Sequence, residues 1–374
     1  MALRLPTTRR QVLGFNGYGE GCGFSIKSFF EKIAFYKIAP GQVRYLSSLD
    51  YGKAEGLAGA AIEQMERDFV VGPPITVHLP NPELMAGVWS MARECLAAGR
   101  GQRARGEVVA AAIARLNQCP YCLDIHTSML HSHGSPGPVD AGDVASWAAA
   151  TLTPGAEVLG RPPFSPGEAP LMVGTAVCFH YLNRMVNVFL HPSPFLIGGD
   201  GWIKDSVRRM AGNLLRPRLA SQLVAPGVFL SDVSEVALPA EFAWASSNPQ
   251  IAGGFLRFIE TAEQAGIESV DPAVRECVLE RVQSWRGETP GLGRDWVEKA
   301  VAALDERKRA AGRLALTTAL ASWQVDERMV AEFRLRQSIG LQKSSDRDLI
   351  NLTSWASYVA ARRIASWTGP GPLN

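Results

Sequence analysis

Two cysteines and a histidine lie close together in the first third of the chain, in the stretch Cys119-Pro120-Tyr121-Cys122 followed by His126. Proline is favoured at the first position of a helix, so Pro120 predicts a helix start with Cys119 at its cap and Cys122 in its first turn. The helix dipole and the unpaired N–H groups there stabilise thiolates. His126 lies one turn after Cys122 on the same face. An imidazole in that position can take or return the thiol proton near neutral pH.

A carboxylate completes the cluster, because Glu107 precedes Cys119 by twelve positions. A helical hairpin would turn it back towards the thiols and form a proton relay. Two cysteines in one helical turn can form a disulfide. Such a disulfide encloses only a very short loop and would add little stability, which favours a redox cycle over a structural crosslink. In such a cycle one thiolate attacks a peroxide oxygen and becomes a sulfenic acid. Its neighbour condenses with it, and an external dithiol reduces the disulfide.

Two other interpretations of the cluster remain open. The C-x-x-C pair and His126 supply three zinc ligands, with His131 or His133 as a fourth, although structural zinc sites normally pair two such motifs. The thiols could instead be inert and buried beside a hydrogen-bonded histidine. Glu107 on its own is more often a capping or surface carboxylate than a catalytic one.

The surrounding sequence predicts helices, since apolar residues recur at spacings of three and four. Asn81-Pro82-Glu83 is a typical helix start, and a Gly- and Arg-rich loop is expected over 99–106. No segment shows the alternating pattern of a strand, so the predicted fold class is all-α. The helices expected in the first half span 50–69, 81–98, 107–117, 120–133, 144–152 and 169–190.

Three short patterns of the first half return in the same order in the second half. They pair 81–87 with 248–254, 120–124 with 322–326, and 145–148 with 353–356. A helix layer that cannot bury its face alone would pack against its own duplicate. We therefore expect an N-terminal extension over 1–45, a first helical copy over 46–195, a connecting region over 196–240 and a second copy over 241–374.

The second copy lacks the chemistry of the first. Aligned on its repeat, it has Arg309, Ala321, Gln324 and Arg328 where the first copy has the carboxylate, the two thiols and the imidazole. One redox centre per chain is expected, and the second copy has a structural role.

Composition excludes several classes of protein. Of 374 residues, 47% are apolar and 20% are charged, which suits a sizeable core and excludes a disordered chain. The net charge of +2 is too balanced for a protein that grips nucleic acid or acidic membranes. The most apolar stretch, 171–190, contains His180 and Arg184, which indicates a buried or half-buried helix and not a membrane span.

The cysteines and the N-terminus indicate a cytoplasmic protein. Six cysteines are too few for a disulfide scaffold, and a single C-x-x-C is typical of a reducing compartment. Arg9-Arg10 has a twin-arginine look, but no apolar run follows it, so an export signal lacks its hydrophobic region. Cys95 and Cys178 are expected to be core thiols.

A polar stripe interrupts the apolar helix expected over 169–190. His180, Asn183, Arg184 and Asn187 follow the spacing i, i+3, i+4, i+7. A solvated helix face is the first expectation. The alternative is that these side chains, with Tyr121, line a substrate pocket or a partner interface.

The spacing of Glu107, Cys119, Cys122 and His126 resembles the signature of the alkylhydroperoxidase D family, within the carboxymuconolactone decarboxylase superfamily. The resemblance implies an all-α peroxidase that uses its C-x-x-C pair without a metal or other cofactor. It also implies that Cys122 attacks the peroxide and that Cys119 donates a proton and then resolves the intermediate. The family often has a histidine between the cysteines, where this chain has Tyr121, so one member of its relay is missing or replaced.

The likeness extends more loosely over 46–370, as in longer two-copy members of the superfamily. A helix terminus usually activates the first cysteine of a C-x-x-C pair most, whereas His126 is placed to serve Cys122, so the choice of nucleophile stays open on the residues alone.

The leading hypothesis is a thiol-dependent peroxidase that reduces alkyl hydroperoxides. Its rivals are a disulfide oxidoreductase, a superfamily lyase or biosynthetic enzyme acting on a small organic substrate, and a non-enzymatic scaffold. The expected partners are a small-molecule hydroperoxide, a thiol or a lipoyl or thioredoxin-like reductant, and further copies of the chain in a homo-oligomer. No nucleic acid or membrane partner is expected.

Overall fold

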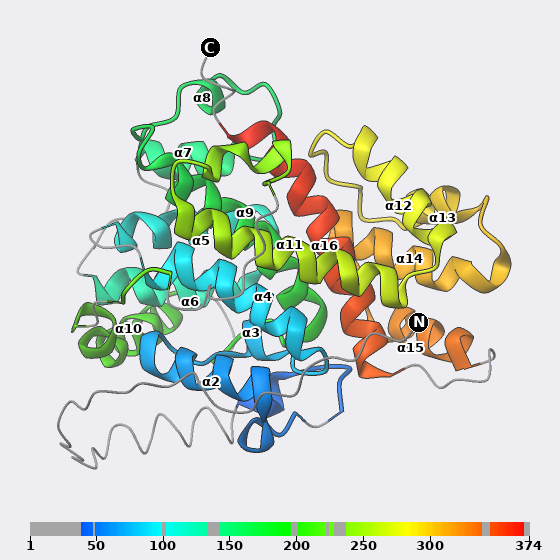
Figure 1. Cartoon of the computed structure of the whole chain (residues 1–374), viewed down its shortest axis with the longest axis horizontal. Coiled ribbons are helices and arrows are strands. Elements are labelled where there is room, and N and C mark those ends of the chain that lie inside the picture. The colour runs from blue at the N-terminus through cyan, green and yellow to red at the C-terminus, as the bar shows by residue number, and fades with distance from the viewer. Residues whose placement is uncertain are drawn as a thin grey trace, which may run out of the picture.

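The computed structural model describes residues 39–47, 49–98, 102–133, 142–195, 201–221, 224–227, 237–338 and 345–369 (Figure 1). These residues are helical throughout, apart from turns and a single antiparallel bridge between Val43 and Leu190. The all-α prediction is therefore confirmed. Most of the expected extension over 1–45 lies outside the described residues.

The helices follow one another in two runs separated by α10 (Trp202–Ser221). The first run comprises α2 (Gly56–Asp68), α3 (Pro73–Thr76), α4 (Pro82–Ala92), the π-helical turn η4 (Arg93–Ala97), α5 (Arg103–Leu116), α6 (Pro120–Ser132), α7 (Asp143–Ala149), α8 (Glu157–Gly160) and α9 (Ala169–Phe189). The second comprises η5 (Ala240–Ala245), α11 (Pro249–Ser269), α12 (Pro272–Ser284), α13 (Asp295–Val301), α14 (Glu306–Ala321), η6 (Ser322–Gln324), α15 (Glu327–Ser338) and α16 (Asp346–Thr368).

The two halves meet where α4 packs on α11, and both helices start alike. Asn81 caps α4 by accepting a hydrogen bond from the N–H of Leu84, and Asn248 caps α11 in the same way. Each cap is followed six residues later by a glycine at the crossing. A Cβ on Gly254 would lie 2.9 Å from the backbone oxygen of Ser90, so only glycine lets the helices approach this closely.

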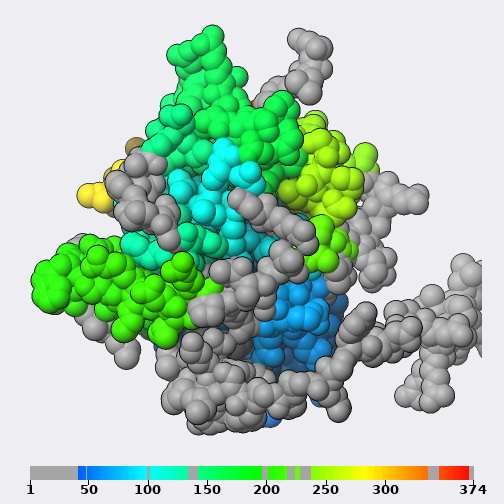
Figure 2. Space-filling model, turned by 90° about the vertical axis from the view of Figure 1, so that its left-hand side faces the viewer, coloured from blue at the N-terminus to red at the C-terminus, as the bar shows by residue number. Residues whose placement is uncertain are grey.

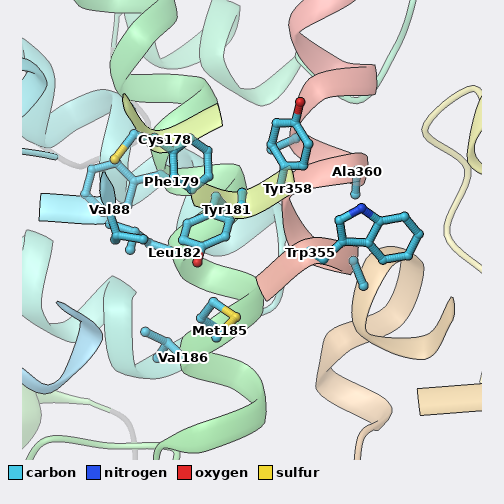
Figure 3. Close-up of a cluster of buried hydrophobic side chains, with 14 of the residues drawn as sticks. Val88, Cys178, Phe179, Tyr181, Leu182, Met185, Val186, Trp355, Tyr358 and Ala360 are labelled. Carbon is cyan, nitrogen blue, oxygen red and sulfur yellow. The ribbon is translucent and has the colours of Figure 1, made fainter. Parts of the chain in front are cut away.

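The core lies between the long helices α9 and α16, which belong to different halves (Figure 3). Met185 of α9 accepts weak hydrogen bonds from Ser354 and Ser357 of α16. Between the helices, the rings of Tyr181 and Phe258 meet edge to face, with centroids 4.7 Å apart. Nearly every residue of α9 is buried, so this helix forms the centre of both halves at once.

Two of the differences from the sequence prediction concern elements beside the motif. α5 starts at Arg103, so the loop expected over 99–106 is too long and Glu107 lies inside the helix. The expected connecting region over 196–240 contains the 20-residue helix α10. Gly212 and Pro217 lie within that helix, and both residue types weaken helices, which is why the pattern did not predict it. Figure 2 shows α10 (bright green) as a ridge on the outside of the molecule.

Replacing Gly266 by alanine should destabilise the fold. Its Cβ would enter the contact space of the Trp355 indole, which is fully enclosed and has no room to shift. Overpacking of this kind costs about 1–3 kcal/mol of unfolding free energy. Gly106→Ala is the matched control, because a Cβ there meets nothing within 4 Å, and it should stabilise the protein by about 0.5–1 kcal/mol. Urea unfolding of both variants measures the difference, and equal effects would contradict the packing argument.

Acid should weaken the fold through His78. This side chain is buried between Ile75 O and the Tyr181 hydroxyl, both at 2.8 Å, and burial lowers its pKa to about 4. Between pH 6.5 and about 4, the unfolded chain binds a proton that the folded chain does not, so the unfolding free energy falls by about 3 kcal/mol over this range. In His78→Gln that loss should be absent from the pH dependence measured by urea unfolding. An unchanged slope would show that His78 is not the group responsible.

Candidate active site

The motif lies on the helical hairpin of α5 and α6. After α5 ends at Leu116, Gln118 adopts a left-handed conformation with φ of 50°, which reverses the chain. Cys119 then caps α6, its N–H donating to Ala114 O at 2.8 Å, and Pro120 takes the first helical position. The predicted helix start is confirmed, and Cys122 lies in the first turn.

Glu107 faces α6 across the hairpin. Its Oε2 lies 2.7 Å from Nδ1 of His126, and the two side chains are only 1% and 7% exposed. The ring of Phe179 from α9 meets the imidazole edge to face, with centroids 4.4 Å apart. The tertiary structure thus brings together a carboxylate and an imidazole from separate helices, in a site closed on its third side by an apolar ring.

Cys119 and Cys122 are free thiols whose side chains contact one another, and both are buried. Burial raises the pKa of Cys119 well above its usual value, and the neighbouring Cys122 raises it further. Burial thus acts against the expectation that the helix terminus favours the thiolate of Cys119. Cys119 is placed as a protonated thiol beside Cys122.

Tyr121 occupies the position between the cysteines and is also buried. Its hydroxyl donates to Oε1 of Gln42 at 3.1 Å, and burial raises the pKa of the phenol. The segment that contains Gln42 is itself held by α9, since the N–H of Arg44 donates to Phe189 O at 2.7 Å. The Tyr121 hydroxyl therefore ties this segment to the first turn of α6, and its hydrogen bond does not lead to the Glu107–His126 pair.

Three residues of the polar stripe of α9 are buried and the fourth, Asn187, is half-buried, so the solvated face expected from the sequence is wrong. His180 bonds through its Nε2 to Thr151 at 2.9 Å and through its Nδ1 to Asn117 at 3.1 Å. The side-chain amides of Asn117 and Asn183 are also 3.1 Å apart. Burial lowers the pKa of His180, which stays a neutral hydrogen-bonding ring. These contacts fix Asn117, two residues before the first cysteine.

The other two residues of the stripe connect that turn to the second half. Nε of Arg184 donates to Ala319 O at 2.8 Å. Nδ2 of Asn187 donates both to Asn117 O and to the hydroxyl of Ser322, each at 3.0 Å. The stripe is thus a buried polar bridge between the two copies, whose partners satisfy groups that would otherwise be costly to bury.

Sequence reasoning missed Asp124, which lies on the opposite face of α6 from His126 and is completely buried. It pairs with Lys204 at 3.1 Å and with Nε of Arg208 at 3.0 Å, both on α10, and accepts from Ser193 at 3.1 Å. Because α10 was not predicted, no partner for this carboxylate could be found from the sequence. These ion pairs hold α10 against the helix that carries the thiols.

The aligned positions of the second copy have other partners. Arg309 donates to Leu304 O, Gln324 donates to Gly291 O, and Arg328 pairs with Glu332. These contacts are local to the second half, and Ala321 stands where the first copy has a thiol. None of these four aligned positions, all within the described residues, carries the residue type found in the first half.

Comparisons with known proteins agree with the motif. A model of the carboxymuconolactone decarboxylase family matches residues 82–158. A protein of Mycobacterium tuberculosis named alkyl hydroperoxide reductase Rv2159c is 32% identical over 342 residues, covering 87% of this chain and 95% of the relative. The chain belongs to the carboxymuconolactone decarboxylase family. It is an alkylhydroperoxidase D-like member, and the segment matched by the family model holds all four motif residues. No solved structure matches the chain.

The described residues of the family member contain neither a helix that could span a membrane nor a cluster that could hold a metal ion. None of its described helices has the length and apolar character that crossing a bilayer requires. Across the same residues, no group of three or more His, Cys, Asp or Glu side chains is arranged to hold a metal ion.

Replacing Asp124 by asparagine should loosen α10. The change leaves Lys204 and Arg208 without their buried counter-ion, and losing one partner of such a cluster costs about 3 kcal/mol of unfolding free energy. Asp205→Asn is the matched control, because Asp205 pairs with the same Arg208 but is 56% exposed, and its loss should cost under about 0.5 kcal/mol. Urea unfolding compares the two. Similar effects would show that the buried cluster contributes no more than a surface ion pair.

Proposed function

We propose that the chain is a thiol-dependent peroxidase that reduces organic hydroperoxides through a disulfide cycle of Cys119 and Cys122. The observation that carries this proposal is the buried hydrogen bond between Glu107 and His126, on the helix face that Cys122 shares. A buried thiol pair without a nearby base would be inert. The name of the mycobacterial relative, alkyl hydroperoxide reductase, supports the same substrate class.

The imidazole acts as the base of the first step. An ionised Glu107 accepts the hydrogen bond from Nδ1, so Nδ1 carries the ring proton and Nε2 is free to accept the thiol proton of Cys122. An unassisted cysteine, with a reference pKa of about 8.5, is only a few per cent thiolate at pH 7, so removal of this proton is what activates it. Tyr121 is not needed for this transfer.

The cycle balances in three steps. The Cys122 thiolate attacks the terminal peroxide oxygen, the O–O bond breaks, and the alcohol leaves with a proton from His126, while Cys122 becomes a sulfenic acid. The Cys119 thiol then attacks that sulfur, a disulfide forms and water leaves. The disulfide is then reduced by thiol–disulfide exchange, which returns two electrons and two protons. The reductant is a small thiol or a dithiol of the lipoyl or thioredoxin-like kind. The raised pKa of Cys119 suits a resolving thiol that is not the first nucleophile.

Peroxide consumption with excess dithiol tests the proposal. Cys122→Ser should abolish turnover. Cys119→Ser should permit one reaction per chain and leave a sulfenic acid that a dimedone probe detects by mass spectrometry. Cys277→Ser, which removes a half-buried thiol of α12, is the control and should keep the full rate. Wild-type turnover by Cys122→Ser would overturn the peroxidase assignment, and wild-type disulfide exchange without peroxide turnover would support the oxidoreductase alternative.

A second test isolates the base. His126→Ala should slow peroxide consumption by ~10²-fold or more, the usual size of general-base assistance. Alkaline pH should restore the rate only in part, because hydroxide replaces the base and not its orientation. The rate at which Cys122 is alkylated, followed by peptide mass spectrometry across pH, measures activation directly. Identical profiles in wild type and His126→Ala would exclude the imidazole and favour helix-terminus activation of Cys119.

A further inference from the structure

The two carboxylate oxygens of Glu107 have different partners. Oε2 takes the hydrogen bond of His126, whereas Oε1 faces Nε of Arg103 at 3.9 Å, one turn earlier on α5. Neither the motif nor the family resemblance assigns a role to Arg103. The side chain is 12% exposed, which is unusual for an arginine, because this residue type is almost never buried without a partner.

The guanidinium of Arg103 is held by an aromatic ring and not by acceptors. It stacks over Phe69 at 4.7 Å from the ring centroid. Its Nε and Nη2 atoms are enclosed and have no hydrogen-bond partner within the described ranges. Burial lowers the pKa of Arg103 and Glu107 opposes that shift. The carboxylate of Glu107 is the acidic group that lies beside this charge. Burial lowers the pKa of His133, and the same charge lowers it further.

Arg103 and Glu107 line the same narrow crevice, whose walls also include Cys95, Leu96, Gln102 and Leu171. The titratable or charged groups facing Glu107 are Arg103 from α5, His126 and the half-buried His133 from α6, and Cys95 from η4. The α9 side contributes the apolar ring of Phe179. Arg103 is the permanent cation in this set.

We propose that Arg103 is a positioning residue whose charge keeps Glu107 ionised, so that Glu107 holds His126 in the tautomer with its proton on Nδ1. A carboxyl group buried among apolar side chains favours its neutral form unless a cation lies beside it. A neutral Glu107 would donate its own proton to Nδ1 and drive the ring proton to Nε2. In that tautomer the imidazole has no free nitrogen for the thiol. This inference rests on the proposed function in one respect only, which is that the Glu107–His126 pair serves the Cys122 thiol.

Nitrogen NMR of the full chain, labelled in its six histidines, tests the proposal without peroxide. The ¹⁵N shifts of the His126 ring distinguish the two tautomers, and His126→Gln assigns the signals. Wild type and Arg103→Lys should show the proton on Nδ1 at pH 8. Arg103→Gln should move it to Nε2, and the rate of Cys122 alkylation at pH 7 should fall roughly tenfold. Arg105→Gln is the matched control, since Arg105 pairs with Glu168, and should match wild type in both readouts.

A folded Arg103→Gln variant that keeps the proton on Nδ1 would overturn the proposal, as would loss of that tautomer in Arg103→Lys. Near-ultraviolet circular dichroism establishes folding. If Arg103→Gln does not fold, the same measurements are made on Arg103→Met, because methionine keeps an apolar contact with Phe69. The tautomer does not depend on turnover. A protein without peroxidase activity but with the expected shift would therefore refute the proposed function and leave the role of Arg103 standing.

Discussion

Near-complete burial of α9 is the constraint on which the rest of the structure depends. A helix buried over almost its whole surface can keep polar residues only if the protein itself supplies their partners. His180 and Asn187 find theirs at Asn117, beside the thiol pair, and Arg184 and Asn187 find others in the second half. The same helix presents Phe179 to the imidazole. One buried element therefore joins the halves and positions the site.

Burial and activation oppose each other at the thiols. Enclosing Cys119 and Cys122 excludes water from the reacting sulfurs but also raises the pKa of Cys119. Burial can keep one thiol protonated while a neighbouring base takes the proton of the other. The Glu107–His126 hydrogen bond lies on the helix face that Cys122 shares, and in the proposed function this imidazole is the base that serves Cys122.

The two helical halves share one core. Each copy presents a glycine where α4 crosses α11, and each lends one long helix to the shared core. Ala319 and Ser322 of the second half support the turn before Cys119 through α9. The contribution of this half that the contacts show is packing and hydrogen bonding.

The sequence by itself determined what depends on neighbours along the chain: the helical class, the asparagine caps with proline at the first helical position, the start of α6 and the spacing of the redox motif. Tertiary structure decided what depends on distant partners. The stripe of α9 looked solvated until the second half covered it. Asp124 had no visible partner until α10 packed beside it, and Arg103 lay in an expected loop. Helix signals are local, whereas burial and ion pairing are set by whichever element packs against a face, and spacing along one chain does not contain that information.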